Sequence, residues 1–109
     1  MEVKKKINTG IIGSGFAAGF HIEAIRRIYG TRVNIVGVFS RRLENAQRFS
    51  EKYGVPCFPG LEELIEGCDV LHLCTPPVTH ESLAINILGK GKHVIIEKPL
   101  TGYFGKDAT

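Results

Sequence analysis

The sequence is poor in cysteine, and the three that it has, Cys57, Cys68 and Cys74, form no Cys-x-x-Cys pair. An odd number of cysteines at irregular spacing argues against a disulfide framework and against a zinc site, so we expect no metal centre. Cys74 lies inside an apolar run, where it is most simply interpreted as a small core residue. This cysteine usage is typical of a protein of the reducing cytoplasm.

Long apolar runs are also missing, and nothing approaches the roughly 18 consecutive apolar residues that a membrane span needs. Lys4, Lys5 and Lys6 precede a short apolar stretch as in a secretory signal, but polar and glycine residues interrupt that stretch, so we do not expect a signal peptide. The formal net charge is only +3, and no aromatic residues alternate with the lysines. We therefore expect a solvated leader, with no membrane and no nucleic acid as partner.

The sequence does contain a regular alternation of apolar segments with two different patterns. Runs that are apolar on both faces, such as Val33–Phe39, are typical of strands in a parallel sheet that helices cover on both sides. Segments with apolar residues three or four positions apart lie between these runs and predict helices. The expected strands are 7–12, 33–39, 55–58, 70–74 and 93–97, and the expected helices are 17–29, 43–53, 61–65 and 80–88.

This alternation predicts an α/β fold built on a doubly wound parallel sheet of about five strands, incomplete at its C-terminal side. The third strand can only be a short edge strand, because Pro56 has no N–H to donate to a ladder. The chain length suits one domain. We expect that domain over residues 1–100, followed by a loop-like tail over residues 101–109.

The first expected strand ends in GSGFAA, residues 13–18, a G-x-G-x-x-A sequence that leads into a helix. In a Rossmann dinucleotide-binding unit the first glycine permits a tight turn, the second lets the backbone approach a pyrophosphate, and a small third residue lets helix and strand pack closely. The start of the helix offers free N–H groups and partial positive charge to the phosphates. Gly13, Gly15, Phe16 and Ala17 are therefore predicted cofactor-binding residues. A glycine turn without a ligand is the alternative.

The end of the second expected strand is the position that distinguishes NAD from NADP. A carboxylate there would bind the ribose hydroxyls of NAD and repel a 2′-phosphate, but this sequence has Ser40, followed by Arg41 and Arg42. A serine hydroxyl and an arginine fork suit a 2′-phosphate, so we predict NADP as the preferred cofactor and NAD as the second choice. The case is stronger for Arg41 than for Arg42. In the alternative interpretation both arginines are solvated residues at the start of the next helix.

A further candidate segment, Thr75-Pro76-Pro77, follows the fourth expected strand. In an open parallel sheet, ligands bind beyond the carboxyl ends of the strands near the switch point, where this segment is expected. The prolines fix the backbone and Thr75 offers a hydroxyl, so Thr75, Pro76, Pro77 and His80 are predicted to contact the cofactor. The alternative is a rigid turn in which Thr79 caps a helix and His80 lies in its first turn.

The fifth expected strand ends in Glu97 and Lys98, ahead of Pro99. A lysine at the carboxyl end of an interior strand is unusual, because burying an ammonium group without a partner is costly. There it could touch the nicotinamide ribose or a substrate hydroxyl and help to move a proton. Glu97 and Lys98 are predicted cofactor contacts, and Lys98 is the predicted catalytic residue. The alternative is a lysine that pairs with Glu97 or reaches solvent.

Taken together with His21 and with the GKHV stretch of residues 91–94, these segments resemble the N-terminal Rossmann domain of the glucose-fructose oxidoreductase/inositol dehydrogenase/MocA family. The resemblance covers nearly the whole chain, with the segments in the right order. It implies an NAD(P)-dependent dehydrogenase that passes a hydride between nicotinamide and a sugar, cyclitol or related polyol. It also implies that the lysine matched by Lys98 handles substrate and proton, and that the parent enzyme is a homo-oligomer.

The chain departs from the family pattern in its length. Family members continue into a C-terminal substrate domain that supplies an aspartate and a histidine beside the substrate, and we find no counterpart of that domain here. We therefore expect a truncated fragment that binds the cofactor but is inactive alone. Two other interpretations stay open: a non-catalytic redox-sensor module that binds the nucleotide, and a methyltransferase, which favours an acidic residue where Ser40 stands.

Overall fold

The structure is a computed structural model that describes residues 6–28 and 32–96. Its strands are β1 (Ile7–Ile12), β2 (Val33–Phe39), β3 (Val70–Leu73) and β4 (His93–Ile96). Its helices are α1 (Phe16–Ile28), α2 (Leu43–Tyr53), α3 (Leu61–Glu66) and α4 (His80–Gly89), with a short 3-10 turn, η2 (Pro77–Thr79), ahead of α4. Apart from the expected strand 55–58, the predicted order of strands and helices is confirmed along the described chain.

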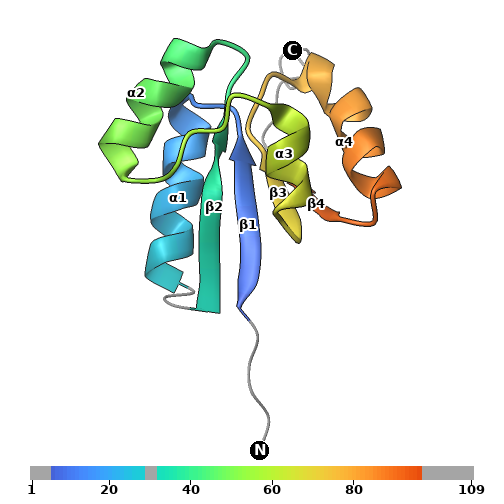
Figure 1. Ribbon diagram of the computed structural model, residues 1–109, viewed down its shortest axis with the longest axis horizontal. Helices are drawn as coiled ribbons and strands as arrows, with labels where there is room; N and C mark the ends of the chain where they lie inside the picture. Colours follow the sequence, from blue (N-terminus) through green and yellow to red (C-terminus); the bar gives the residue numbers. More distant parts are fainter. Residues whose placement is uncertain (1–5, 29–31, 97–109) are drawn as a thin grey trace, which may run out of the picture.

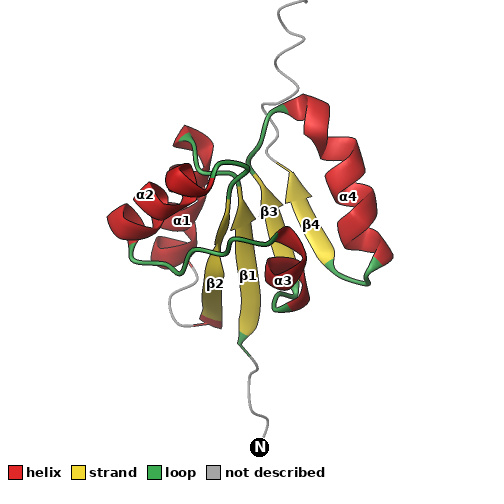
Figure 2. Ribbon diagram, turned by 45° about the horizontal axis from the view of Figure 1, so that its top comes forward, coloured by secondary structure: helices red, strands yellow, loops and turns green. Residues whose placement is uncertain are grey.

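The four strands form one parallel sheet in the order β2-β1-β3-β4. The chain therefore leaves β1 in one direction to build β2 and returns past β1 to build β3 and β4. Helices α1 and α2 cover one face, and α3 and α4 cover the other (Figures 1 and 2). This is the predicted doubly wound α/β fold, and its switch point lies between the carboxyl ends of β1 and β3.

The two faces have separate cores, and β1 contributes to both. Ile11 is fully buried against α1 and α2, while Ile12 is buried against α3 and α4. Consecutive side chains of a strand point to opposite faces of a sheet, so both must be apolar in a strand that helices cover on each side. This is the physical cause of the adjacent isoleucines at the end of β1.

Strand β2 carries a bulge at Val36. Thr9 of β1 pairs with Ile35 and the next residue, Gly10, pairs with Gly37, so Val36 is one residue too many for the ladder. Ile35 packs against the α1 and α2 core, and Val38, three positions later, does so as well. The bulge shifts the alternation of side chains between the two faces by one residue, and it bends the strand so that its carboxyl end changes direction.

The segment 55–58 is not a full strand, which differs from the sequence-based expectation of about five strands. Among the described residues it makes a single parallel bridge, Val38 to Cys57. The Val38 N–H donates to the Pro56 carbonyl at 2.9 Å, and the Phe58 N–H donates to the Val38 carbonyl at 2.9 Å. Pro56 has no N–H, so the ladder cannot extend toward the start of the segment.

The ends of the helices follow the glycines of the sequence. Gly54 adopts a left-handed conformation (φ +68°) and its N–H closes α2 on the Ser50 carbonyl at 2.8 Å, as expected for a C-terminal cap. Gly30, the expected cap of α1, lies outside the described residues. No helix in the described part of the chain is long and apolar enough to cross a membrane.

None of the three cysteines forms a disulfide bond in the described part of the chain, and Cys68 is buried in the core of α3 and α4. Burial raises the pKa of the Cys68 thiol to about 12. Cys74 is half-buried and packs against the α1 and α2 core, in keeping with its interpretation as a small core residue.

Candidate functional site

The glycine turn after β1 brings the carboxyl ends of three strands together. Gly13 has a φ of +113°, a conformation that side chains strongly disfavour. Its N–H donates to the Phe39 carbonyl at the end of β2, at 2.7 Å. A Cβ atom at this position would lie 2.6 Å from the Cys74 carbonyl oxygen, just beyond β3. Gly13 is therefore required by the backbone itself, at the switch point of the sheet.

Gly15 differs from Gly13, because a Cβ atom added to it would meet nothing within 4 Å. The residue is exposed and lies immediately before the first turn of α1, which contains no acidic side chain. The first backbone N–H groups of a helix have no partner within the helix, and those of α1 begin at Phe16 and Ala17. The open space in front of them is suited to a phosphate group.

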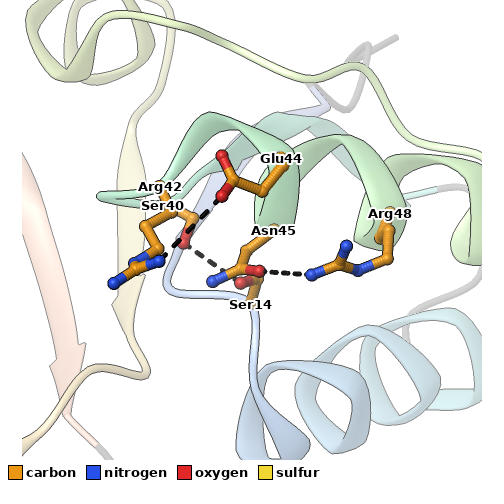
Figure 3. A network of polar contacts seen from close by, with 6 residues as sticks. All are labelled: Ser14, Ser40, Arg42, Glu44, Asn45 and Arg48. Carbon is orange, nitrogen blue, oxygen red and sulfur yellow. Dashed lines mark hydrogen bonds and ion pairs between the residues drawn. The ribbon is translucent and has the colours of Figure 1, made fainter.

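The end of β2 is tied to the glycine turn by a pair of serine hydroxyls. The Ser14 hydroxyl donates to the Ser40 hydroxyl over 3.1 Å (Figure 3). The predicted ribose-recognition position thus lies directly beside the predicted pyrophosphate turn. Arg41 is exposed and makes no ion pair or hydrogen bond with the described residues.

Arg42 is placed differently from Arg41. Its guanidinium lies 4.0 Å from the carboxylate of Glu44, and both side chains are exposed. Its carbonyl accepts the N–H groups of Asn45 and Ala46, which makes Arg42 the N-terminal cap residue of α2. The alternative raised by the sequence, a solvated arginine at the start of a helix, describes Arg42 well.

A cavity of about 940 Å³ runs between α1 and α2 and opens at the glycine turn. Its walls include residues of the turn and both helices: Ser14, Gly15, Phe20, Arg48, Lys52 and Tyr53. Gly19 of α1 also lines it, and a Cβ atom there would collide with the Tyr53 hydroxyl. The sequence-based search missed this cavity. A glycine inside a predicted helix was the available signal, because glycine is unfavourable there without a packing reason.

The Thr75-Pro76-Pro77 segment follows β3 and is held by its own side chains. The Thr75 and Thr79 hydroxyls lie 2.7 Å apart, and the Thr79 hydroxyl donates to the Pro76 carbonyl at 2.8 Å. His80 is only 9% exposed, and its Nε2 lies 2.7 Å from the Thr75 carbonyl oxygen. A carbonyl only accepts, so this nitrogen carries a proton. Thr79 does not cap α4 through its side chain.

These residues lie at the carboxyl edge of the sheet next to the glycine turn, because Cys74 contacts Gly13. Pro76 and Pro77 are exposed and free to face a ligand, whereas His80 points inward and supports the loop. The structure therefore brings the Gly13–Ala17, Ser40–Arg42 and Thr75–His80 groups to one edge. Glu97 and Lys98, the remaining predicted site residues, lie outside the described residues.

A histidine pair beneath the site was not predicted as such. His21 of α1 and His72 of β3 face each other with 2.8 Å between their Nδ1 atoms, and their rings meet edge to face. One Nδ1 must donate and the other accept, so only one of these two nitrogens carries the shared proton. The pair ties the helix behind the glycine turn to the strand that carries the Thr75 loop. A polar residue within the apolar strand 70–74 was the signal in the sequence.

Two groups with shifted pKa values lie away from this edge. Hydrogen bonds from Lys90 and Asn86 lower the pKa of the Glu62 carboxyl on α3, and burial raises that of the Cys68 thiol. Neither side chain lines the cavity between α1 and α2. The described part of the site thus offers hydrogen-bond donors, hydroxyls and arginines, a chemistry suited to binding phosphates.

Comparison with known proteins gives a consistent result. Residues 7–105 match GFO_IDH_MocA, described as an oxidoreductase family with an NAD-binding Rossmann fold. The chain is 38% identical over 96 residues to glucose-6-phosphate 3-dehydrogenase of Bacillus subtilis (strain 168). The matched segment covers 88% of this chain and 26% of that protein.

Two solved structures show the same fold at similar identity. The WlbA dehydrogenase from Bordetella pertussis, in complex with NADH and UDP-GlcNAcA, matches with a TM-score of 0.80 and 30% identity over 92% of this chain and 30% of that one. KijD10, a 3-ketoreductase from Actinomadura kijaniata in complex with NADP and TDP-benzene, matches with a TM-score of 0.76 and 30% identity, over 88% and 30%. The chain spans less than a third of the length of each of these proteins.

Proposed function

This chain belongs to the glucose-fructose oxidoreductase/inositol dehydrogenase/MocA family of oxidoreductases, and we propose that it forms the cofactor-binding part of an NAD(P)-dependent dehydrogenase. The proposed reaction passes a hydride between nicotinamide and a carbon of a sugar, cyclitol or related polyol. The names of the similar proteins, which include a glucose-6-phosphate 3-dehydrogenase, support a carbohydrate substrate. In this proposal the parent enzyme is a cytoplasmic homo-oligomer.

The observation that carries the proposal is the contrast between the two glycines of the turn. Gly13 is fixed by its φ of +113° and by its contact with the Cys74 carbonyl, while the space in front of Gly15 is open. The fold does not require a glycine at position 15, and a glycine there would let a ligand approach the backbone closely. The N-terminus of α1 faces that space, so a pyrophosphate fits the residues present.

Each part of the cofactor is assigned to a described group. The main-chain N–H groups at Phe16 and Ala17 would hold the pyrophosphate, and the hydroxyl of Ser40 with Arg41 would hold an adenosine 2′-phosphate. Thr75, Pro76 and Pro77 would line the path toward the nicotinamide. When bound, the nicotinamide supplies the hydride chemistry. NADP is the preferred cofactor in this proposal, because the end of β2 carries no carboxylate.

Arg42 and His80 have secondary roles in this assignment. The Glu44 carboxylate already faces Arg42, so Arg42 adds only long-range attraction for the phosphates. His80 acts on the cofactor through the Thr75 carbonyl that it holds. Glu97 and Lys98 stay predictions, with Lys98 contacting substrate and moving a proton.

We assign no turnover to residues 1–109 by themselves. The chain spans less than a third of each similar protein named above, and the site proposed here from the described residues is a site for the cofactor alone. A nucleotide-binding sensor module would behave in the same way in a binding experiment. Sugar-dependent reduction of NADP by the polypeptide alone would contradict this part of the proposal.

The proposal is tested by titrating the 109-residue chain with NADPH, NADH and S-adenosylmethionine. The sequence contains no tryptophan, so nicotinamide emission can be followed with little protein background, and calorimetry serves for S-adenosylmethionine. We expect NADPH to bind most tightly and S-adenosylmethionine not to bind. Tighter binding of S-adenosylmethionine overturns the dehydrogenase assignment. NADH binding tenfold tighter than NADPH removes the role given to Ser40 and Arg41.

A further inference from the structure

Arg48 on α2 is a cation near the end of β2 that the sequence pattern did not select. It lines the cavity between α1 and α2 together with Ser14 and Gly15, which places it on the same side of the turn as the open space at Gly15. The guanidinium donates from Nη2 to the Asn45 side-chain oxygen at 2.7 Å (Figure 3). Asn45 lines the same cavity.

The direction of this contact is informative. Side chains of a helix lean toward its N-terminus, so a residue in the second turn covers the surface of the first. Asn45 lies three residues before Arg48, and the hydrogen bond shows the guanidinium lying back along α2 toward the end of β2. Arg48 therefore extends toward the Ser14 and Ser40 hydroxyl pair rather than away from it.

The charge of Arg48 is also uncompensated. No carboxylate among the described residues lies within ion-pair distance of it, whereas Arg42 faces Glu44 at 4.0 Å. The acidic residue that lines the cavity, Glu23, lies 3.6 Å from Arg27 on its own helix. The end of the cavity next to the glycine turn thus has the Arg48 guanidinium, the Ser14 hydroxyl and the Asn45 amide in its lining, with the Ser40 hydroxyl bonded to that of Ser14.

We propose that Arg48, held by Asn45, is a ligand of the 2′-phosphate of NADP and a specificity-determining residue of this site. The phosphate would lie among the Ser14 and Ser40 hydroxyls and the Arg48 guanidinium, with Arg41 approaching from the exposed side. Arginine suits this role because its fork offers two parallel N–H donors to a phosphate. The inference rests on the proposed function, and it replaces Arg42 with Arg48 as the second arginine of the subsite.

The test compares Arg48→Gln with two matched controls, Arg27→Gln and Lys52→Gln, each of which also removes one positive charge from the lining of the cavity. Lys52 lines the same cavity one turn further along α2, so it controls for the general charge of the cavity. The probes are NADPH and NADH by nicotinamide emission, and adenosine 2′,5′-bisphosphate and AMP by calorimetry. The second pair isolates the 2′-phosphate from the nicotinamide half.

We expect Arg48→Gln to weaken the binding of NADPH and of adenosine 2′,5′-bisphosphate about tenfold, while the affinities for NADH and AMP change less than twofold. The controls should change the NADPH to NADH ratio by less than twofold. Salt should weaken NADPH binding less steeply in Arg48→Gln than in the unsubstituted chain, because one phosphate contact is gone. Arg48→Lys, which keeps a charge but loses the fork, should retain part of the affinity.

Each other outcome decides against the inference or against its premise. An unchanged NADPH to NADH ratio in Arg48→Gln, with the thermal unfolding midpoint preserved, overturns the role of Arg48. An equal loss of NADPH affinity in Arg48→Gln and Lys52→Gln would mean that only the total charge of the cavity matters, and it also overturns the role of Arg48. Failure of the unsubstituted chain to bind either nucleotide contradicts the proposed function instead.

Discussion

The two halves of the molecule present their polar groups in opposite ways. In the first half, β1 to α2, the polar groups of the site surround an open space: the backbone at Gly15, the exposed Arg41 and the Arg48 guanidinium. In the second half, α3 to β4, the polar groups of the Thr75 loop bond to one another through Thr79 and His80. The comparison teaches that the first half leaves its polar groups open for a ligand, whereas the Thr75 loop of the second half uses its polar side chains to hold its own shape.

The largest effect is expected from Gly13→Ala. A φ of +113° is strained for any side chain, and the new Cβ atom would lie 2.6 Å from a main-chain oxygen that cannot rotate away. We expect the free energy of unfolding to fall by at least about 2 kcal/mol. Urea denaturation measures it. A loss below about 0.5 kcal/mol would mean that the junction of the three strand ends can relax, contrary to the structure.

His80→Ala should act mainly on stability and so mark the second half as a scaffold. It removes a buried ring and leaves the Thr75 carbonyl without its donor, which we expect to cost about 2 kcal/mol. Thr79→Ala, which removes the hydroxyl bonded to the Pro76 carbonyl in the same loop, should cost less than half as much. Unchanged denaturation with a tenfold loss of NADPH affinity would instead make His80 a direct cofactor contact.

Gly15→Ala should have the opposite effect: it should weaken NADPH binding and leave the stability of the fold unchanged. No atom lies within 4 Å of the added methyl group, so we expect the denaturation midpoint to stay within error of that of the unsubstituted chain. The methyl group would occupy the space assigned to the pyrophosphate, and the dissociation constant for NADPH should rise about tenfold. Gly89→Ala, at a glycine of α4 where an added Cβ atom would also meet nothing within 4 Å, is the control for binding. Equal NADPH affinity in Gly15→Ala would break the comparison, because the open space would then have no ligand.

The smallest effect is expected on the surface of the second half, at Glu62. Lys90 lies 2.7 Å from this carboxylate and lowers its pKa, with Asn86 contributing. A lowered pKa stabilises the folded state above the ordinary carboxyl range, and the stabilisation is lost as the pH falls through that range. The denaturation midpoints of Glu62→Gln and the unsubstituted chain should differ slightly near neutral pH and converge in acid. Divergence in acid would contradict the assigned direction.

The sequence allowed much of this arrangement to be predicted, because the relevant signals are local. Gly13 and Gly15 signal a turn at fixed spacing, and the run 33–39 ends at Ser40 whatever lies around it. The features that were missed depend on contacts between distant segments. Arg48 lines the same cavity as the glycine turn only because α1 and α2 pack together, and the close approach of Tyr53 to Gly19 is visible only once they do. The segment 55–58 was predicted as a strand, yet Pro56 limits it to one bridge.

The bulge at Val36 determines how this site could be altered by design. Val36 is the one residue by which β2 exceeds its pairing with β1, and beyond it the strand end carries Ser40 beside Ser14. A chimera that exchanges cofactor preference with a relative can therefore join the two sequences after Val36 without changing the register. A junction before Val36 must transfer the extra residue as well. Without it Ile35 and Val38 would still face the α1 and α2 core, but the bulge would be lost, and with it the bend that it gives to the strand ahead of Ser40.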